Sequence, residues 1–373
     1  MSATPVARSA RHGPGPATHL RLGGAATDSA ASARCLRQVR HHRSNSYGDR
    51  AGSVRIRLIV PLLLLLVGRA NAQSAGRLDA VLRAQRDSGF AGVVLVARGD
   101  SIVFEKAYSQ PTAKPLTLSS KFNIGSMTKG FTAAAILSLR SQHRLSFSDP
   151  ISRFFPHAPD QKRDITVFHL LTHTSGLASH SAGAGIMRRD GAVTAILSQR
   201  LEYPPGTHYR YADDDYQLLA AIIEMASGET WERYVDRELL APTRMRSTTF
   251  QGGDWGHKGA NGMRSTARDI YRWITAIHDA RLFGRTESRE LESPLMHVRS
   301  EPPFEIHYGY GTRVYVRNGR VAEVMHSGSG DARNTSVARV LADGTILIVL
   351  SNAGQRRGTT WASYVAQRLV PRR

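Results

Sequence analysis

The chain has 373 residues, of which 41% are hydrophobic and 21% are charged, a composition typical of a globular protein. Its formal net charge is +20, yet no run of lysines and arginines is interleaved with aromatic residues, which argues against a nucleic-acid partner. The single cysteine, Cys35, lies near the amino terminus, so the remainder of the chain can form neither a disulfide nor a cysteine-based metal site.

The first 72 residues differ in composition from the rest. Residues 1–53 are rich in Arg, His, Ser, Ala and Gly and lack the aliphatic clusters that a core requires. Two explanations remain open for this segment. Either translation begins near Val54, or the chain carries a real, disordered basic extension.

A secretory signal is predicted at about residues 54–72. Two arginines precede the apolar run 58–67, and small residues follow it up to Ala72. The mature chain then begins near Gln73 and is secreted or periplasmic. The apolar run is too short to span a bilayer comfortably, so no stable membrane span is expected after cleavage. An uncleaved segment would instead anchor the protein to the membrane.

The mature part predicts an α+β fold. Helical spacing occurs at 76–88, and two β-rich runs at 92–97 and 102–108 flank a Gly-Asp turn, which predicts a hairpin. The middle section, about 126–250, forms a helical lobe of the domain 73–373, with helices expected at 126–142, 166–172, 191–200, 213–227 and 229–240. Further strands are expected at 310–317, 321–326, 334–341 and 345–351, followed by a closing helix around 361–369. We therefore expect one antiparallel sheet covered by helices, with a helical lobe inserted.

The most informative motif is Ser126-x-x-Lys129 at the start of the apolar helical pattern. Residues three apart on a helix face the same way, so the Lys129 side chain is expected beside the Ser126 hydroxyl. A serine becomes a good nucleophile when a neighbour takes its proton, and a partly desolvated lysine can do so. On spacing alone, an N-cap serine followed by a surface lysine is the better interpretation of this pattern.

Further motifs follow in order and make the pattern specific. They are Leu170-Leu171-Thr172-His173-Thr174-Ser175-Gly176, Tyr211-Ala212-Asp213 and His326-Ser327-Gly328. Together they resemble the serine β-lactamase and penicillin-binding-protein superfamily, in particular its class C, DD-peptidase and esterase branch. The resemblance spans about residues 76–370. It implies the β-lactamase/DD-peptidase-like fold, an antiparallel sheet flanked by helices with an inserted helical lobe.

The resemblance also implies roles for individual residues. Ser126 would attack a carbonyl and form an acyl-enzyme, with Lys129 holding or receiving its proton. Tyr211 would act as general base and then as general acid, with neighbouring cations favouring its phenolate. His326 would bind a substrate carboxylate or support Tyr211. Gly328 would let the substrate approach the strand, and the backbone N–H of Ser329 would complete an oxyanion hole with that of Ser126.

Two departures from the family pattern affect substrate choice. Asp213 replaces the usual Asn, and a carboxylate can only accept hydrogen bonds where an amide both donates and accepts. Beside Lys129 it would favour the ammonium and weaken the lysine as a base. We expect β-lactams to be bound less well, with the result that either esters or peptide-like substrates are favoured or activity is reduced. The stretch Asp331–Ser336 also differs from the Gly-Phe of relatives.

Other polar groups have simpler interpretations. His169 and His173 are four apart like a zinc pair, but no Glu follows His169, and packing or hydrogen bonding is the expected role. The acidic run 213–215 is expected to be a solvated helix N-terminus. No Gly-x-Ser-x-Gly elbow occurs, which argues against an α/β-hydrolase.

The prediction is therefore a serine hydrolase of β-lactamase, DD-peptidase or esterase type, acting without a metal or organic cofactor. Its substrate would be a small molecule or a peptide with an amide, β-lactam, D-amino-acid peptide or ester carbonyl, and peptidoglycan is a candidate partner. The alternative is a catalytically silent protein of the same fold that binds cell-wall peptide or a protein partner.

Overall fold

The computed structural model describes residues 75–87, 89–111, 113–178, 181–329 and 335–353. Cys35, the predicted signal segment 54–72 and the predicted closing helix at 361–369 lie outside these ranges. Among the residues that are described, no helix combines the length and the apolar character needed to cross a membrane.

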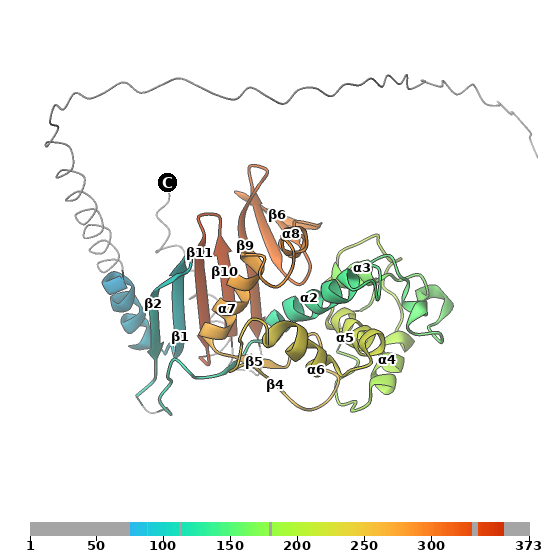
Figure 1. The fold of residues 1–373 in the computed structure, drawn as a ribbon, viewed down its shortest axis with the longest axis horizontal. Helices are drawn as coiled ribbons and strands as arrows, with labels where there is room; N and C mark the ends of the chain where they lie inside the picture. Colours follow the sequence, from blue (N-terminus) through green and yellow to red (C-terminus); the bar gives the residue numbers. More distant parts are fainter. Residues whose placement is uncertain (1–74, 88, 112, 179–180, 330–334, 354–373) are drawn as a thin grey trace, which may run out of the picture. The chain divides into compact units, whose positions relative to one another are not determined.

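An eight-stranded antiparallel sheet forms the centre of the domain, in the order β2-β1-β11-β10-β9-β8-β7-β6 (Figure 1). A small second sheet has the order β3-β5-β4. The strands are β1 (Gly92–Arg98), β2 (Ser101–Tyr108), β3 (Phe122–Asn123), β4 (Thr249–Phe250), β5 (Met263–Ser265), β6 (Met296–Glu301), β7 (Phe304–Tyr308), β8 (Arg313–Arg317), β9 (Arg320–Ser329), β10 (Thr335–Leu341) and β11 (Thr345–Ser351).

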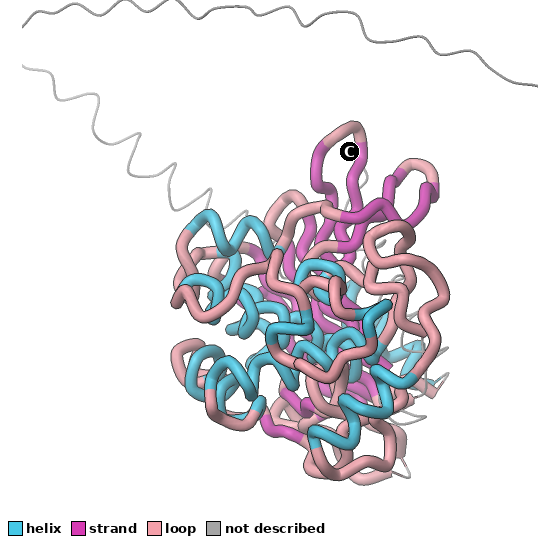
Figure 2. Tube along the Cα trace, turned by 90° about the vertical axis from the view of Figure 1, so that its right-hand side faces the viewer, coloured by secondary structure: helices cyan, strands magenta, loops and turns pink. Residues whose placement is uncertain are grey.

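The helices lie in the middle of the sequence and form a region beside the sheet; viewed from that side, helices and loops lie in front of the strands (Figure 2). A helix over residues 75–87 precedes β1. The others are α2 (Thr128–Ser141), α3 (Val167–Leu171), α4 (Arg189–Ser198), α5 (Asp213–Ser227), α6 (Trp231–Val235), α7 (Ala267–His278) and α8 (Arg285–Leu291), with the short turns η1 (Gly125–Met127), η2 (Ile151–Arg153), η3 (Asp160–Lys162) and η4 (Asp236–Leu240).

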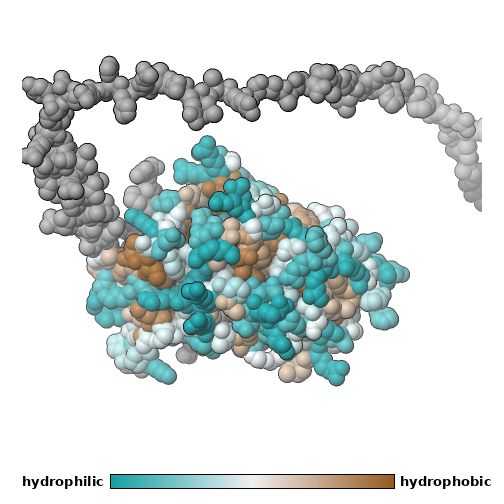
Figure 3. All heavy atoms as spheres, in the orientation of Figure 1, coloured by the Kyte–Doolittle hydropathy of each residue, from teal (hydrophilic) through white to brown (hydrophobic). Residues whose placement is uncertain are grey.

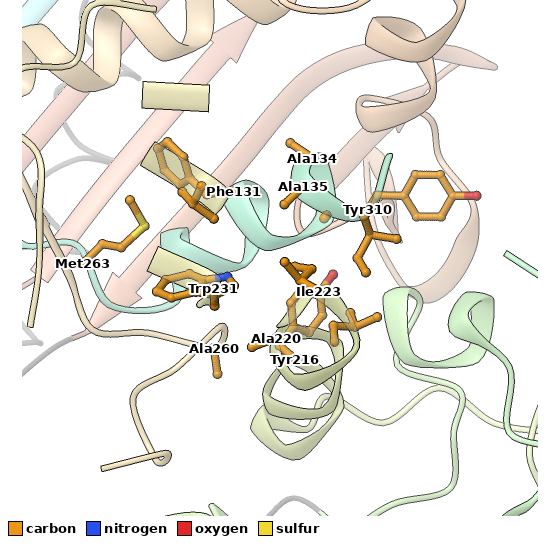
Figure 4. Close-up of a cluster of buried hydrophobic side chains, with 14 of the residues drawn as sticks. Phe131, Ala134, Ala135, Tyr216, Ala220, Ile223, Trp231, Ala260, Met263 and Tyr310 are labelled. Atoms are coloured by element: carbon orange, nitrogen blue, oxygen red, sulfur yellow. The ribbon is translucent and has the colours of Figure 1, made fainter. Parts of the chain in front are cut away.

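The central strands are apolar on both faces because helices cover both. Every residue of β11 is buried, as is all of β1 except Arg98. Such runs of Val, Ile and Leu are typical of strands enclosed on both sides. On one face, Leu78 and Leu82 pack against the sheet. The other face supports the larger core, which includes Phe131 and Ala134 of α2 and Tyr216 and Ile223 of α5 (Figure 4).

The predicted architecture is confirmed. β1 and β2 form the expected hairpin, and β8 to β11 lie where strands were expected. Other elements differ. β9 extends to Ser329, three residues beyond the predicted end, and this extension brings its last residues to the site described below. The strand predicted at 310–317 begins only at Arg313. The helices α7 and α8 and the strands β6 and β7 were not predicted.

The surface is mixed in character. Figure 3 shows hydrophilic residues spread over one face, with hydrophobic residues in small patches between them. Only five large hydrophobic side chains are exposed among the described residues: Ile102, Leu118, Met187, Met225 and Val321. Exposed residues scattered in this way are normal for a globular protein, so they identify no binding face.

Candidate active site

The site begins at a sharp turn that leads into α2. Gly125 has φ +51°, and its N–H donates to the side-chain oxygen of Asn123 at 2.8 Å. Ser126 follows within η1, so it precedes α2 rather than lying inside it. Its side chain is partly exposed, whereas Lys129 in the first turn of α2 is fully buried. One group is thus open to a substrate, and the other is shielded from water.

Lys129 connects the serine to the rest of the site. Its Nζ lies 3.3 Å from Ser126 Oγ, 2.7 Å from Asp213 Oδ1 and 2.9 Å from the Ala260 carbonyl oxygen. Burial lowers the pKa of Lys129, but the charges and hydrogen bonds of Tyr211 and Asp213 raise it more, so the net shift is upward. Lys129 is therefore an ammonium that donates to all three oxygens.

Tyr211 lies directly beside this ammonium. Lys129 Nζ is 4.8 Å from the centroid of the Tyr211 ring, and the tyrosine also contributes a hydrogen bond to Lys129. Tyr211 ends the loop that leads into α5, and Asp213 is the first residue of that helix. The segment that enters α5 therefore places both side chains beside Lys129.

The end of β9 packs against the turn that carries the serine. A Cβ placed on Gly328 would lie 1.8 Å from the Ile124 carbonyl oxygen and 2.8 Å from the Ser126 backbone nitrogen. One placed on Gly125 would lie 2.7 Å from the Ser329 nitrogen. Gly328 thus permits close contact between two backbone segments. The same contact brings the backbone N–H groups of Ser126 and Ser329 to one edge of the site.

His326 lies at the boundary between this site and the interior. Its Nδ1 donates to its neighbour's carbonyl, Ser327 O, at 2.8 Å, while its Nε2 is buried and has no hydrogen-bond partner among the described residues. Burial, together with the charge of Lys129, lowers the pKa of His326 to about 3. The ring lines an apolar cavity of about 80 Å³ behind α2, whose wall also includes Met127 and Glu292. His326 is therefore neutral at physiological pH.

The sequence comparison decides the family. The Beta-lactamase family model matches residues 78–369, most of the chain. The chain belongs to the β-lactamase family. Members of this family are serine hydrolases, among them penicillin-binding proteins, amidases and β-lactamases.

Individual relatives agree with this assignment. The protein PbpX of Bacillus subtilis (strain 168) is 30% identical in an alignment of 240 positions, which covers 56% of this chain and 60% of that protein. The chain thus matches less than two thirds of the length of this relative.

Solved structures share the fold. A penicillin-binding protein from Bacillus halodurans superposes with a TM-score of 0.68 at 21% identity, over 79% of this chain and 100% of that one. The D-amino acid amidase from Ochrobactrum anthropi SV3 gives a TM-score of 0.67 over 80% of this chain and 97% of that one, at 19% identity in its complex with L-phenylalanine amide.

Within this β-lactamase-family domain, the structure brings Ser126, Lys129, Tyr211 and Asp213 together, and the end of β9 adjoins them. Their roles in catalysis stay predictions. The departure at Asp331–Ser336 lies largely outside the described residues.

Two simpler interpretations can be checked directly. His169 caps α3, because its N–H donates to Thr166 Oγ1 and its Nδ1 accepts from the Thr166 N–H, so the expected hydrogen-bonding role is confirmed.

The acidic run 213–215 is not a solvated helix end. Asp214 and Asp215 are 1% and 0% exposed, because α5 begins inside the domain. That prediction was wrong.

Sequence reasoning missed two kinds of functional neighbour. The first is the Ala260 carbonyl, which accepts a hydrogen bond from Lys129. The pattern of side chains along a sequence does not predict which backbone carbonyl will face a site. The second is a buried network around His173 that includes Asp215 and Tyr308. The available signal was the motif around His173, which was interpreted only as a structural element.

Acidification is expected to destabilise the fold through His326. Its folded-state pKa of about 3 is below the value near 6.5 of an unfolded chain, so the unfolded state binds the proton first. The free energy of unfolding therefore falls as pH drops from about 6.5 towards 3, by up to about 1.4 kcal/mol per pH unit. His326→Gln cannot take up this proton. Urea denaturation at several pH values should give a shallower decline for the variant, with the exposed His157→Gln as control. If the free energy of unfolding fell equally with pH in wild type and His326→Gln, the low pKa of His326 would not be the cause of the destabilisation.

Proposed function

We propose that the protein is an exported serine hydrolase that acts through an acyl-enzyme on an amide, β-lactam, D-amino-acid peptide or ester carbonyl. One observation carries the proposal: the buried Lys129 ammonium contacts Ser126 Oγ and Asp213, with Tyr211 beside it. A hydroxyl next to a shielded cation and a phenol has what nucleophilic catalysis needs. The apolar pattern at 54–72 supports export.

The reaction divides into two steps. Tyr211 acts in its phenolate form and takes the Ser126 proton as Oγ attacks the substrate carbonyl. The Lys129 ammonium stabilises the negative charge of the phenolate and the charge that develops on Oγ. The oxyanion of the tetrahedral intermediate would accept from the N–H groups of Ser126 and Ser329. Tyr211 then protonates the leaving amine or alcohol as the bond to it breaks. In the second step, Tyr211 takes a proton from water as the water attacks the acyl carbonyl. Tyr211 then returns that proton to Ser126 Oγ as the acyl bond breaks and the acid leaves.

The charges in the site favour uncharged substrates over anionic ones. Lys129 is neutralised by Asp213 at 2.7 Å, and the low pKa of His326 leaves that residue without a positive charge. A substrate carboxylate beside His326 would therefore form no ion pair with that residue. Of the two roles considered for this histidine, support of Tyr211 fits better than carboxylate binding.

Asp213→Asn is expected to raise kcat/KM for a penicillin-type substrate by about tenfold relative to a short-chain ester. The amide can donate a hydrogen bond to the substrate, and one such bond contributes about 1–1.5 kcal/mol. Steady-state kinetics on both substrates measure the ratio. Asp160→Asn, at an exposed position in η3, serves as control. An unchanged ratio in Asp213→Asn would refute the role given to the carboxylate.

The substrate class is tested by turnover of nitrocefin, a D-Ala-D-Ala peptide and a short-chain ester by the purified protein. We expect hydrolysis of at least one, with the neutral ester preferred. No turnover of all three, together with no covalent labelling of Ser126 by a fluorophosphonate, would instead support the silent protein that binds cell-wall peptide or a partner.

A further inference from the structure

His173 contacts the chain on both sides of Tyr211. The Arg210 N–H donates to the His173 carbonyl at 2.8 Å, and the Ala212 N–H donates to its Nδ1 at 3.3 Å. Between these two contacts, the imidazole and the Tyr211 ring lie with centroids 4.5 Å apart. Residues 210–212 thus all contact one buried residue, Arg210 through the backbone carbonyl of His173 and Tyr211 and Ala212 through its ring. His173 itself has φ +57°, a conformation that few non-glycine residues adopt.

The imidazole is in turn fixed by a buried chain of hydrogen bonds. Its Nδ1 lies 2.8 Å from Asp215 Oδ2, and its Nε2 lies 3.1 Å from the Tyr308 hydroxyl. Ser175 Oγ donates to Asp215 Oδ1 at 2.5 Å. At the far end, Tyr308 donates to Tyr216, whose hydroxyl donates to a backbone carbonyl. All four network side chains around the histidine, like the histidine itself, are buried.

The direction of this chain can be assigned. A backbone N–H only donates, so the contact from Ala212 makes His173 Nδ1 an acceptor and puts the ring proton on Nε2. The proton between Asp215 and Nδ1 then belongs to the carboxyl group. Burial acts in the same sense, since it raises the pKa of Asp215 and lowers that of His173. Each hydroxyl, carboxyl and imidazole group donates to the next, and the chain is uncharged.

We propose that His173 is a positioning residue for Tyr211, held in one orientation by the neutral chain Ser175–Asp215–His173–Tyr308. The proposal rests on the proposed function of Tyr211 as general base. His173 does not touch the reacting atoms. It fixes the backbone around Tyr211 and the face of its ring, so that the phenol stays beside Lys129 and Ser126.

Several charged or titratable groups face His173 and bear on its pH behaviour. They come from α2, the loop before α5, α5 itself, β7, β8 and β9: Lys129, Tyr209, Tyr211, Asp215, Tyr216, Tyr308, Arg313 and His326. The cations among them oppose a charge on the imidazole. His173 therefore stays neutral through the physiological range, and its variants are expected to change the rate of acylation but not the shape of its pH profile between about pH 6 and 8.

The test is the reaction of the full chain with a fluorescent fluorophosphonate. The final extent of labelling gives the fraction of protein with a competent site. The rate constant at saturating probe, divided by that fraction, reports the chemical step. Loss of folded protein and loss of positioning are therefore measured separately. We expect His173→Phe, which keeps a ring but removes both nitrogens, to lower the rate constant about 100-fold with little change in probe affinity. Tyr308→Phe should lower it about tenfold, and it tests the same chain if His173→Phe does not fold.

Two further variants make the test specific. Asn at position 215 would still donate to Nδ1 and accept from Ser175, so Asp215→Asn should stay within about threefold of wild type. Tyr310→Phe removes a phenol hydroxyl that is not part of the hydrogen-bonded chain Ser175–Asp215–His173–Tyr308, and it should leave the rate constant unchanged. A wild-type rate constant in His173→Phe would overturn the positioning role. A loss in Asp215→Asn as large as in His173→Phe would overturn the neutral assignment.

A measurement independent of activity distinguishes this inference from the proposed function. Fluorine NMR of the fluorotyrosine-labelled protein should show the Tyr211 resonance shifted or broadened by Tyr308→Phe and unaffected by Tyr310→Phe. Because the Tyr308 ring also lies 6.1 Å from that of Tyr211, Ser175→Ala, which removes the hydroxyl that holds Asp215, should shift the same resonance. If the wild type does not react with the probe at all, the proposed function fails, and this resonance alone decides whether His173 positions Tyr211. An unchanged Tyr211 resonance in Tyr308→Phe would overturn the inference even in an active enzyme.

Discussion

Ser126→Ala is expected to abolish turnover of every acyl substrate, with kcat at least about 10⁴-fold lower than in wild type. The alanine leaves no oxygen to form the acyl bond, while Lys129, Tyr211 and Asp213 keep their contacts with one another. Ser126 is partly exposed, and its side chain contributes one 3.3 Å contact to the site. Thermal denaturation should therefore show a folded protein of nearly unchanged stability.

Steady-state kinetics with the substrate that wild type prefers measure this loss. A Ser126→Ala variant that is folded and retains more than a few per cent of kcat would contradict the assignment of the nucleophile. In that case the activity would have to come from another group or from a contaminating enzyme.

Lys129→Met is expected to lower the acylation rate by about 10³-fold, within the range usual for loss of a group that assists proton transfer. Methionine has a similar volume but cannot donate to Ser126, Asp213 or the Ala260 carbonyl. The free energy of unfolding should fall by about 1–3 kcal/mol, because a buried carbonyl loses its donor. The Asp213 side chain is 27% exposed and can be solvated, so the full cost of a broken buried pair is not expected. Burst kinetics and urea denaturation measure the two effects.

The chain offers a matched control in a second fully buried lysine. Lys162 Nζ donates to the Leu197 carbonyl at 2.5 Å and to that of Gln199, and no carboxylate pairs with it in the part of the chain that is described. Burial lowers the pKa of Lys162, the opposite of the net shift at Lys129. Lys162→Met should reduce stability but leave the acylation rate per competent site unchanged. Equal losses of rate in the two variants would show that Lys129 acts only through stability.

Local patterns predicted those elements whose burial is regular along the chain. β1 and β11 are continuous apolar runs, and α2 and α5 carry apolar residues at helical spacing. The missed strand β6 is mostly exposed, so its sequence lacks the apolar alternation that identifies a strand. β6 is held by pairing with β7, a tertiary interaction that a local pattern does not contain.

The site was predictable to the extent that it is local. Ser126 and Lys129 are three residues apart, and the continuous helical turn from η1 into α2 brings them together. Tyr211 lies in the loop before α5 and Asp213 is the first residue of that helix, both more than 80 residues away, and only the family resemblance pointed to them. The buried partners of His173 could not be foreseen, since whether Asp215 faces water or a histidine depends on how α5 packs. The packing of α5 also explains why the acidic run 213–215 was wrongly expected to be solvated.

The central claim is that Ser126 is the residue that becomes acylated. Intact-protein mass spectrometry after reaction with a fluorophosphonate or a labelled penicillin, followed by peptide mapping, tests it directly. We expect one adduct per chain, located on the peptide that contains Ser126. A folded protein that gains no adduct, or an adduct mapped to any other residue, would contradict it.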